Sequence, residues 1–280
     1  MTKPRALVLT GYGINCDYET TQACETVGFS ADRLHLNDVF EKPGALFEYG
    51  LVVFPGGFSY GDDLGSGVAY SSKIRFSDSG NGDRLFDMFM DYVQRDGLVL
   101  GICNGFQILV RLGMLPAMEY GYGTQQVTLA PNREGYFINR WVELVVQQDS
   151  PSIFTRGLRR IRLPVRHGEG RFILPDEELL QKLERNRHVA LRYCDADGKA
   201  TQTFPRNPNG SQNAIAGICD PTGRVFGLMP HPEAAMTLYH FPDWMAIKER
   251  AIRSGETLST TGDGHAIFKN AFEYALRTGS

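Results

Sequence analysis

The sequence predicts an α/β fold: a doubly wound, mostly parallel sheet with helices on both faces, flavodoxin-like, with an antiparallel layer from the second half. Three runs in the first half, 5–10, 51–54 and 98–103, are apolar at consecutive positions rather than alternating. This pattern is typical of strands buried on both faces of a parallel sheet. Helix-like segments separate the runs, and this β-α-β-α-β order favours the doubly wound arrangement.

Two of the intervening segments have helix signals. Residues 17–29 start with Asp17, a residue type that caps helix N-termini, and reach Gly28, which is typical of a helix end. Residues 82–97 carry apolar side chains near helical spacing. The polar, glycine-containing stretch 77–83 just before them predicts a loop tip.

The second half has short strand patterns separated by turn signals, within 140–148, 161–172, 189–198 and 213–231. Asp197-Gly198 and the turn at 220–223 predict hairpin-like connections between antiparallel strands. An amphipathic pattern closes the chain. We expect one domain over 1–280 with a helical extension over about 240–280.

Composition narrows the functional classes. The 280 residues carry a net charge of -3, and basic residues are not massed anywhere, which argues against nucleic-acid and anionic-membrane partners. The cluster Arg156, Arg159, Arg160 and Arg162 is expected to be solvated surface. No run reaches the roughly 20 apolar residues of a membrane span, and no signal peptide is evident. Five cysteines without metal-ligand spacing favour a reducing, cytoplasmic location and no metal site.

Cys103 stands between an apolar run and a helix pattern, in the stretch GICNG. A nucleophile at a strand-to-helix turn is held above the edge of the sheet, and Gly101 and Gly105 leave room for such a turn. The amides at the start of the following helix would favour a thiolate, and the Asn104 amide could donate to an oxyanion. The alternative is an ordinary buried cysteine beside packing glycines.

His231 is the histidine best suited to serve a thiol nucleophile. It ends an apolar run, and Pro232 disfavours helical geometry at His231. In an extended segment His231 and Glu233 would project to the same side, where the carboxylate can orient the imidazole. The alternative is a loop histidine at a strand end.

A third feature follows the buried run 51–54, where Pro55, Gly56 and Gly57 come in succession. Glycines at the carboxyl end of such a strand let the backbone approach a ligand closely. Gly57 or Phe58 could supply a second oxyanion amide. Taken alone, the three residues form an ordinary turn.

Together these features resemble the class I (triad) glutamine amidotransferase family, whose signatures are PGG, G-x-C-x-G-x-Q and H-P-E in this order. The stretches 13–20, 54–64, 167–172 and 207–218 further resemble the glutaminase components of phosphoribosylformylglycinamidine synthases. The resemblance covers roughly residues 5 to 236. Residues 65–83 and the chain after 240 are less informative.

The resemblance implies a role for each matching residue. Cys103 would attack the side-chain amide of glutamine and form a glutamyl thioester with release of ammonia. His231 would act as general acid and base, and Glu233 would orient it. Gly57 and Asn104 match the oxyanion-hole positions.

It also implies how substrate and partners are engaged. Gln107 and Phe58 would contact bound glutamine. The chain would hold no cofactor and no metal, and ammonia would pass to a large synthase subunit that uses ATP and Mg²⁺, with a small accessory subunit. That complex would make formylglycinamidine ribonucleotide in purine biosynthesis. The absence of a G-x-x-x-x-G-K-[ST] motif agrees with ATP being bound elsewhere.

Two polar, glycine-containing segments, 167–172 and 207–213, are not obviously needed by a triad. We hypothesise that they form loops at the rim of the Cys103 pocket, where His167, Glu169 and Asn209 meet the partner and gate ammonia transfer. The alternative is a pair of tight turns chosen for backbone geometry.

Two other functions remain open at this point. A stand-alone cysteine hydrolase of the DJ-1/PfpI type also places a cysteine at an elbow, although the H-P-E segment and Gln107 argue against it. A regulatory subunit without catalysis would also keep the fold. The intact Cys103, His231 and Glu233 argue against that reading.

Overall fold

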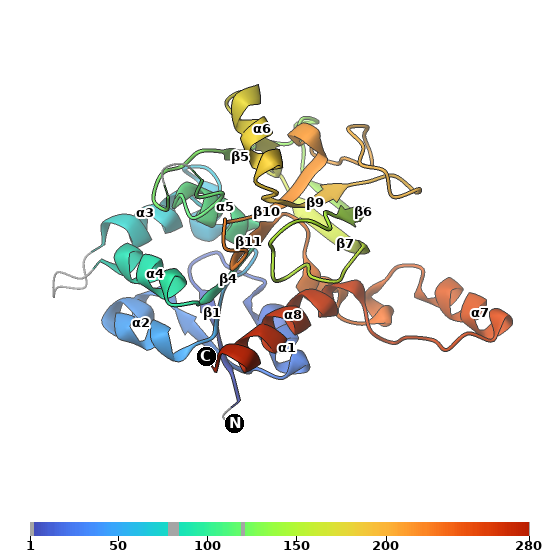
Figure 1. Ribbon diagram of the computed structural model, residues 1–280, viewed down its shortest axis with the longest axis horizontal. Helices are drawn as coiled ribbons and strands as arrows, with labels where there is room; N and C mark the ends of the chain where they lie inside the picture. Colours follow the sequence, from blue (N-terminus) through green and yellow to red (C-terminus); the bar gives the residue numbers. More distant parts are fainter. Residues whose placement is uncertain (1–2, 78–83, 119–120, 280) are drawn as a thin grey trace.

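The computed structural model describes residues 3–77, 84–118 and 121–279. Most of the loop tip expected at 77–83 lies outside these residues. In the described chain one nine-stranded sheet has the order β2-β1-β3-β4-β11-β10-β9-β6-β7 (Figure 1). Its strands are β1 (Arg5–Thr10), β2 (Ser30–His35), β3 (Leu51–Phe54), β4 (Leu98–Ile102), β6 (Ile138–Val146), β7 (Arg160–His167), β9 (Val189–Tyr193), β10 (Ile215–Cys219) and β11 (Val225–Leu228).

The sheet changes character at β11. Strands β2, β1, β3, β4 and β11 run parallel, whereas β10, β9, β6 and β7 continue the same sheet with antiparallel pairings. The predicted fold class is therefore confirmed, and the antiparallel part prolongs the parallel sheet edge to edge. A separate two-stranded sheet pairs β5 (Thr128–Ala130) with β8 (Arg171–Ile173).

The two predicted hairpin turns differ. The turn at 220–223 joins the antiparallel strands β10 and β11, as expected, and the Gly223 amide donates to the Asp220 carbonyl at 3.1 Å. The turn at Asp197-Gly198 is followed only by an isolated bridge between Cys194 and Ala200. It therefore returns the chain without adding a second strand to the sheet.

The helices follow the predicted alternation with strands. They are α1 (Asp17–Val27), α2 (Leu36–Glu41), α3 (Val68–Phe76), α4 (Leu85–Gln94), α5 (Asn104–Arg111), α6 (Glu177–Arg185), α7 (Trp244–Ser254) and α8 (Asp263–Thr278). Gly28 caps the C-terminus of α1, as predicted. The expected cap Asp17 is instead the first helical residue, and Cys16 occupies the N-cap position. As a result of this shift by one residue, the Cys16 thiol lies at the N-terminal end of α1.

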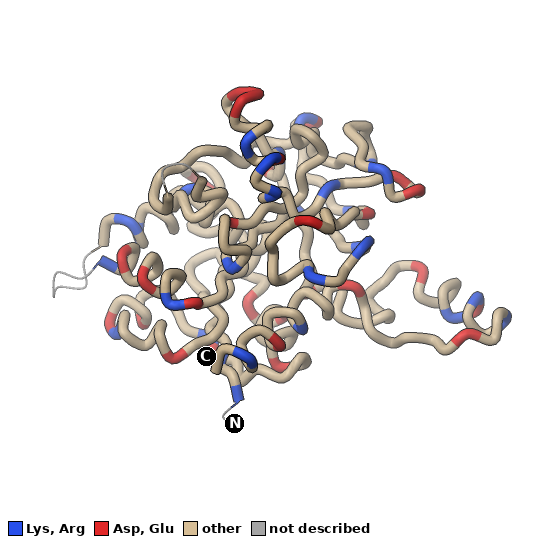
Figure 2. The backbone as a smooth tube through the Cα atoms, viewed as in Figure 1, with Lys and Arg blue, Asp and Glu red and all other residues tan. Residues whose placement is uncertain are grey.

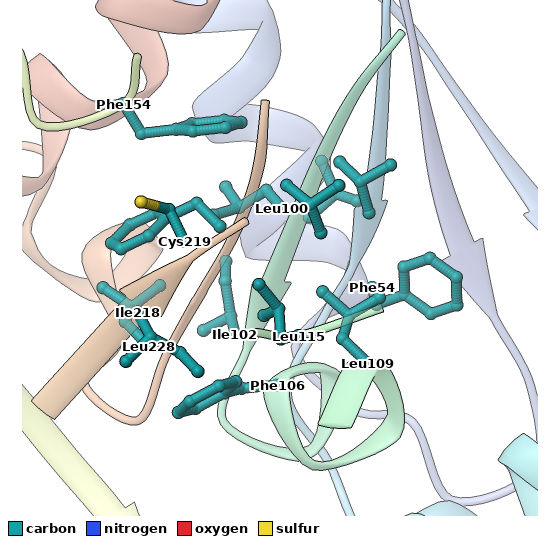
Figure 3. Packing of buried hydrophobic residues seen from close by; sticks show 14 of the residues in the cluster. Phe54, Leu100, Ile102, Phe106, Leu109, Leu115, Phe154, Ile218, Cys219 and Leu228 are labelled. Atoms are coloured by element: carbon teal, nitrogen blue, oxygen red, sulfur yellow. The ribbon is translucent and has the colours of Figure 1, made fainter. Parts of the chain in front are cut away.

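The core lies between the sheet and its helices. Helix α5 packs on β3, β4 and β11, while α8 packs against α1 and β7. Figure 3 shows Phe106 and Leu109 from α5 gathered with Ile102 and Leu115 in one buried cluster. Because α5 follows β4 with one residue between them, this packing fixes the position of Cys103.

In the C-terminal part, α7 lies on an extended arm at the right of Figure 1. Helix α8 then returns to the body. Lys, Arg, Asp and Glu are interspersed over the backbone in Figure 2, in agreement with the absence of a basic face expected from the sequence. Among the described residues, none of the helices combines the length and the apolar character needed to cross a membrane.

Candidate active site

Cys103 occupies the predicted elbow. Strand β4 ends at Ile102, α5 begins at Asn104, and Cys103 between them has φ 51° and ψ −105°. A non-glycine residue with positive φ costs of order 1–3 kcal/mol and persists where its surroundings impose it. A Cβ at Gly105 would lie 1.8 Å from the Phe54 carbonyl oxygen, so only glycine lets α5 approach β3 this closely.

The thiol of Cys103 is turned toward a neighbouring strand. Its Sγ donates to the carbonyl oxygen of Arg166, at the end of β7, over 3.7 Å. The Cys103 amide donates to the Leu228 carbonyl of β11 at 2.9 Å. Cys103 is only 5% exposed, and it lines a cavity.

His231 and Glu233 form a buried pair. Nδ1 of His231 lies 2.6 Å from Oε1 of Glu233, and the side chains are 2% and 1% exposed. His231 is extended, but the expected continuation of that conformation is wrong, because Pro232 begins a short 3-10 helix over Pro232–Ala235. The tight turn, rather than strand alternation, brings the carboxylate back to the ring.

The surroundings of His231 favour its charged form. Burial alone would oppose protonation, but the carboxylate of Glu233, followed by the sulfur of Cys103, holds the pKa of His231 well above its usual value. With Nδ1 facing Glu233, Nε2 is buried and has no hydrogen-bond partner in the described part of the chain. It is therefore the ring nitrogen free to exchange a proton at the cavity.

The two amides expected to stabilise an oxyanion are unoccupied. Within the described residues, neither the Gly57 nor the Asn104 amide donates a hydrogen bond. The Phe58 amide, the other possibility raised by the sequence, donates to the Gly13 carbonyl at 2.8 Å. Gly57 and Asn104 are therefore the better pair of donors for a developing negative charge.

Phe58 and Gln107, expected to contact substrate, have different surroundings. Phe58 lines the Cys103 cavity, and its ring lies 6.1 Å from that of Phe137. Gln107 does not line the cavity. Its Nε2 donates to the carbonyl of Glu169, and its Oε1 accepts from Asn104 Nδ2 at 3.0 Å. Gln107 therefore ties α5 to the 167–172 segment.

The cavity at Cys103 has a volume of about 220 Å³. Besides Gly57, Phe58, Cys103 and His231, it is lined by residues that the sequence did not single out, namely Asn15, Cys16, Glu19, Phe137 and Arg166. In the stretch 13–20 the sequence indicates a family resemblance and, from Asp17, the start of a helix, but no part of a cavity. Its contribution to the cavity depends on long-range pairing that no local pattern signals.

Cys16 lies at the site because the chain before α1 is hydrogen-bonded to the turn at Pro55–Gly57. The amides of Asn15 and Cys16 both donate to the carbonyl of Gly56, at 3.3 and 3.1 Å. Cys16 Sγ then lies 4.0 Å from Nδ1 of His231. Cys16, His231 and Glu233 thus offer three potential metal-ligand atoms within 4.8 Å of one another. The expectation of no metal-binding cluster, drawn from sequence spacing, did not foresee this grouping.

His167 and Asn209 do not form an exposed rim, contrary to the loop hypothesis. Both are buried, at 2% and 0% exposure. His167 Nδ1 lies 3.0 Å from Asn132 Oδ1, and Asn209 Nδ2 donates to the Gly170 carbonyl at 2.8 Å. Burial lowers the pKa of His167 to about 3, so the ring is neutral. Its hydrogen bonds have a structural role. These polar residues are buried because they satisfy one another's donors and acceptors.

Glu169 is the member of that set that remains partly accessible. Its Oε2 accepts from the Ser66 amide at 3.2 Å. Asp62 lies nearby, and burial together with the charge of Glu169 raises the pKa of Asp62. Arg111 Nε donates to the Ser66 carbonyl at 2.7 Å. Glu169 therefore links the loop after β7 to the loop that follows the PGG turn.

A larger hollow, about 650 Å³, lies between the α7 arm and the β6–β7 edge, with Arg162 and Phe241 in its lining. Arg162 is already paired with Asp243 at 2.8 Å, and Arg160 with Glu143 at 3.1 Å. We assign the chemistry to the smaller cavity, because it brings together the Cys103 thiol, the His231 imidazole and the unoccupied Gly57 amide.

A positive-φ cysteine at a strand-to-helix turn, lining one cavity with a histidine that is paired to a buried glutamate, is the arrangement expected of a glutamine amidotransferase of the triad class. A family model described as a CobB/CobQ-like glutamine amidotransferase domain matches residues 3–275, and the chain belongs to this family.

Within this family, the chain is similar to proteins of one particular kind. The chain is 41% identical to the phosphoribosylformylglycinamidine synthase subunit PurQ of Methanococcus maripaludis, over 97% of each protein. It is 40% identical to the subunit of that name from Dehalococcoides mccartyi, covering 98% of this chain and 99% of the relative. The structure of PurLQS from Thermotoga maritima matches at a TM-score of 0.69 and 30% identity, over 98% of this chain and 99% of that one.

Proposed function

We propose that this chain is the glutaminase subunit of a phosphoribosylformylglycinamidine synthase, hydrolysing glutamine to glutamate and ammonia. The observation that carries the proposal is that Cys103, His231 and Gly57 line one cavity, in a chain about 40% identical over nearly its full length to PurQ subunits. The unoccupied amide of Asn104 directly follows Cys103. A cysteine nucleophile with a histidine base is suited to attack on a carboxamide carbon.

The reaction follows from the positions of these groups. With the Cys103 proton held on Nε2 of His231, in the charged form that the Glu233 carboxylate favours, the sulfur attacks the amide carbon of glutamine. The resulting oxyanion accepts hydrogen bonds from the Gly57 and Asn104 amides. The imidazolium then protonates the departing nitrogen, and ammonia leaves a glutamyl thioester. Water, deprotonated by His231, hydrolyses the thioester to glutamate and restores the thiol.

Charged residues at the cavity suit the amino-acid end of glutamine. A free glutamine carries an α-carboxylate and an α-ammonium group, and both keep their charge when bound only if they are paired. Arg166 and Glu19 line the cavity, and they supply one charge of each sign. Arg166 would bind the carboxylate, Glu19 would bind the ammonium group, and the carboxamide would then reach Cys103.

Ammonia released here would be used by a large synthase subunit, with a small accessory subunit completing the complex. The solved relative carries the name PurLQS, which supports an assembly of this kind. ATP and Mg²⁺ would act on the partner, and this chain would need no cofactor of its own. We place the complex in the cytoplasm, which the five free cysteines support.

The test is to purify the chain with and without the synthase subunit from the same organism. We expect the two to co-elute and to convert formylglycinamide ribonucleotide with glutamine as the nitrogen source. Glutamine hydrolysis should accelerate when the synthase ligands are present. A chain that cleaves peptides but not glutamine, or one that never binds the synthase, would contradict the proposal.

A further inference from the structure

Cys16 is a second thiol within the catalytic cavity, and the proposed reaction does not use it. Its Sγ lies 4.0 Å from Nδ1 of His231, on the side of the ring that faces Glu233. Burial raises the pKa of the Cys16 thiol, so the thiol is protonated at neutral pH and makes a poor nucleophile. The sulfur is nevertheless held close to an imidazole and a carboxylate.

The position of Cys16 is set by the backbone. The pairing of the Asn15 and Cys16 amides with the Gly56 carbonyl fixes the turn before α1. A Cβ at Gly56 would lie 2.8 Å from Cε1 of His231 and 3.2 Å from Cys16 Sγ. Because residue 56 has no side chain, the sulfur and the ring can share this corner of the cavity.

We propose that Cys16, His231 and Glu233 form an inhibitory site for a thiophilic divalent cation, Zn²⁺. Thiolate, imidazole and carboxylate are the ligand types that Zn²⁺ takes from proteins, and three candidate ligand atoms lie within 4.8 Å of one another. Binding of the ion does not depend on the proposed glutaminase function, although its consequence for activity does.

The distances permit the site with one adjustment. Zinc–sulfur and zinc–nitrogen bonds at a tetrahedral angle place the two ligand atoms roughly 3.6 Å apart, close to the 4.0 Å between Cys16 Sγ and His231 Nδ1. Two ligands of the N and O type would be roughly 3.4 Å apart. Glu233 must therefore withdraw from its 2.6 Å contact with the ring.

A second, independent observation, the unpaired second oxygen of Glu233, also favours a cation at this position. Oε2 of Glu233 is buried without a hydrogen-bond partner among the residues that the structure describes. Buried polar atoms are normally satisfied, and a carboxylate oxygen left unpaired is suited to a cation. On binding, the Cys16 thiol and Nδ1 of His231 both release their protons to solvent, and water supplies a fourth ligand.

Zinc at this position would stop proton transfer, because it would occupy Nδ1 of His231 and detach the ring from Glu233. A different arrangement, with the ion held by Cys103 and Nε2 of His231, would also inhibit but would not need Cys16. The two arrangements make opposite predictions for single cysteine variants.

The experiment titrates the full chain with Zn²⁺ by calorimetry in a non-chelating phosphine reductant. We expect Cys16→Ser to weaken binding about tenfold or more, since even changes outside the ligand set typically cost 10–100-fold. Cys103→Ser should retain most of the affinity. Cys24→Ser is the matched control, because Cys24 is buried within α1 and does not line the cavity, and its affinity should equal that of the parent.

A second readout covers the case in which Cys16→Ser is poorly folded. Cd²⁺ bound to the Cys103→Ser chain should show the ultraviolet charge-transfer absorbance of one metal–thiolate bond, supplied by Cys16. Glutamine hydrolysis by Cys16→Ala, normalised to its own metal-free rate, should resist Zn²⁺ relative to the parent.

Unchanged Zn²⁺ affinity in Cys16→Ser would overturn the proposal, as would loss of Cd²⁺–thiolate absorbance in Cys103→Ser. A chain that binds Zn²⁺ through Cys16 but hydrolyses no glutamine would leave the site standing and refute the proposed function. The two failures are therefore distinguishable.

Discussion

Nδ1 of His231 and Oε1 of Glu233 are 2.6 Å apart in a buried setting, although the residues belong to different backbone conformations. The imidazole follows strand β11, and the carboxylate sits on the first turn of a 3-10 helix. Because both side chains are buried, the carboxylate of Glu233 acts strongly on the charge of the imidazole. Because the two residues have different roles in this contact, we expect their single substitutions to have different effects.

His231→Ala should be more damaging than Glu233→Ala. Histidine transfers protons, which typically contributes 10²–10⁴-fold, whereas Glu233 orients and polarises the ring and its loss should be milder. The measurement is kcat for glutamine hydrolysis in the assembled complex. The double variant should fall far short of additivity, since the groups act as a unit. Equal losses in the two single variants would contradict this ranking.

The pair should also make stability depend on pH. The folded pKa of His231 is raised, so its stabilising contribution is complete below the unfolded value of about 6.5 and is lost as the pH rises through the folded pKa. Glu233→Gln removes the carboxylate that raises this pKa. The difference in melting temperature between the parent and Glu233→Gln should therefore shrink as the pH is raised above about 6.5. A constant or growing difference would count against the pairing.

Arg166→Ala should raise KM for glutamine with little change in kcat, because the proposed contact with the α-carboxylate is the same in the ground state and the transition state. Steady-state kinetics with glutamine would measure it. Arg159→Ala is the matched control, since Arg159 is exposed and does not line the cavity. An effect on kcat alone would place Arg166 in the chemistry instead.

Asn209→Ala should lower the stability of the fold, whereas Glu169→Ala should affect the coupling between glutamine hydrolysis and the synthase. Asn209 is buried within several hydrogen bonds, so its removal leaves unpaired groups and should cost about 1–3 kcal/mol in the free energy of unfolding.

Glu169 is partly exposed, and Glu169→Ala should leave the fold stable. It should weaken partner binding or uncouple glutamine hydrolysis from synthase turnover. Denaturant titration and coupled rates would measure both effects. If Glu169→Ala changes neither affinity nor coupling, the gating hypothesis fails.

The sequence was informative where a feature is local. The elbow at Cys103 could be predicted, because strand, glycines and helix are contiguous. The parallel strands could be predicted because burial on both faces leaves an uninterrupted apolar run. His231 and Glu233 were paired for the wrong geometric reason, since a proline-initiated turn replaced the extended segment.

The remainder of the site depends on contacts between distant segments. Cys16 and Arg166 reach the cavity through a backbone pairing at Gly56 and through the end of β7, and neither leaves a local pattern. His167 and Asn209 are expected from the sequence in loops at the rim of the Cys103 pocket. The two side chains are instead buried, and their hydrogen bonds to Asn132 and Gly170 join segments far apart in the sequence, which composition does not reveal.

The central claim is that Cys103 releases ammonia that a partner consumes. The most direct measurement compares Cys103→Ala with the parent in the assembled synthase complex, supplying either glutamine or an ammonium salt. Glutamine-dependent synthesis should be abolished, while ammonia-dependent synthesis should equal that of the parent complex. If the variant complex assembles but loses both activities, or keeps glutamine-dependent synthesis, Cys103 is not the nucleophile that this account requires.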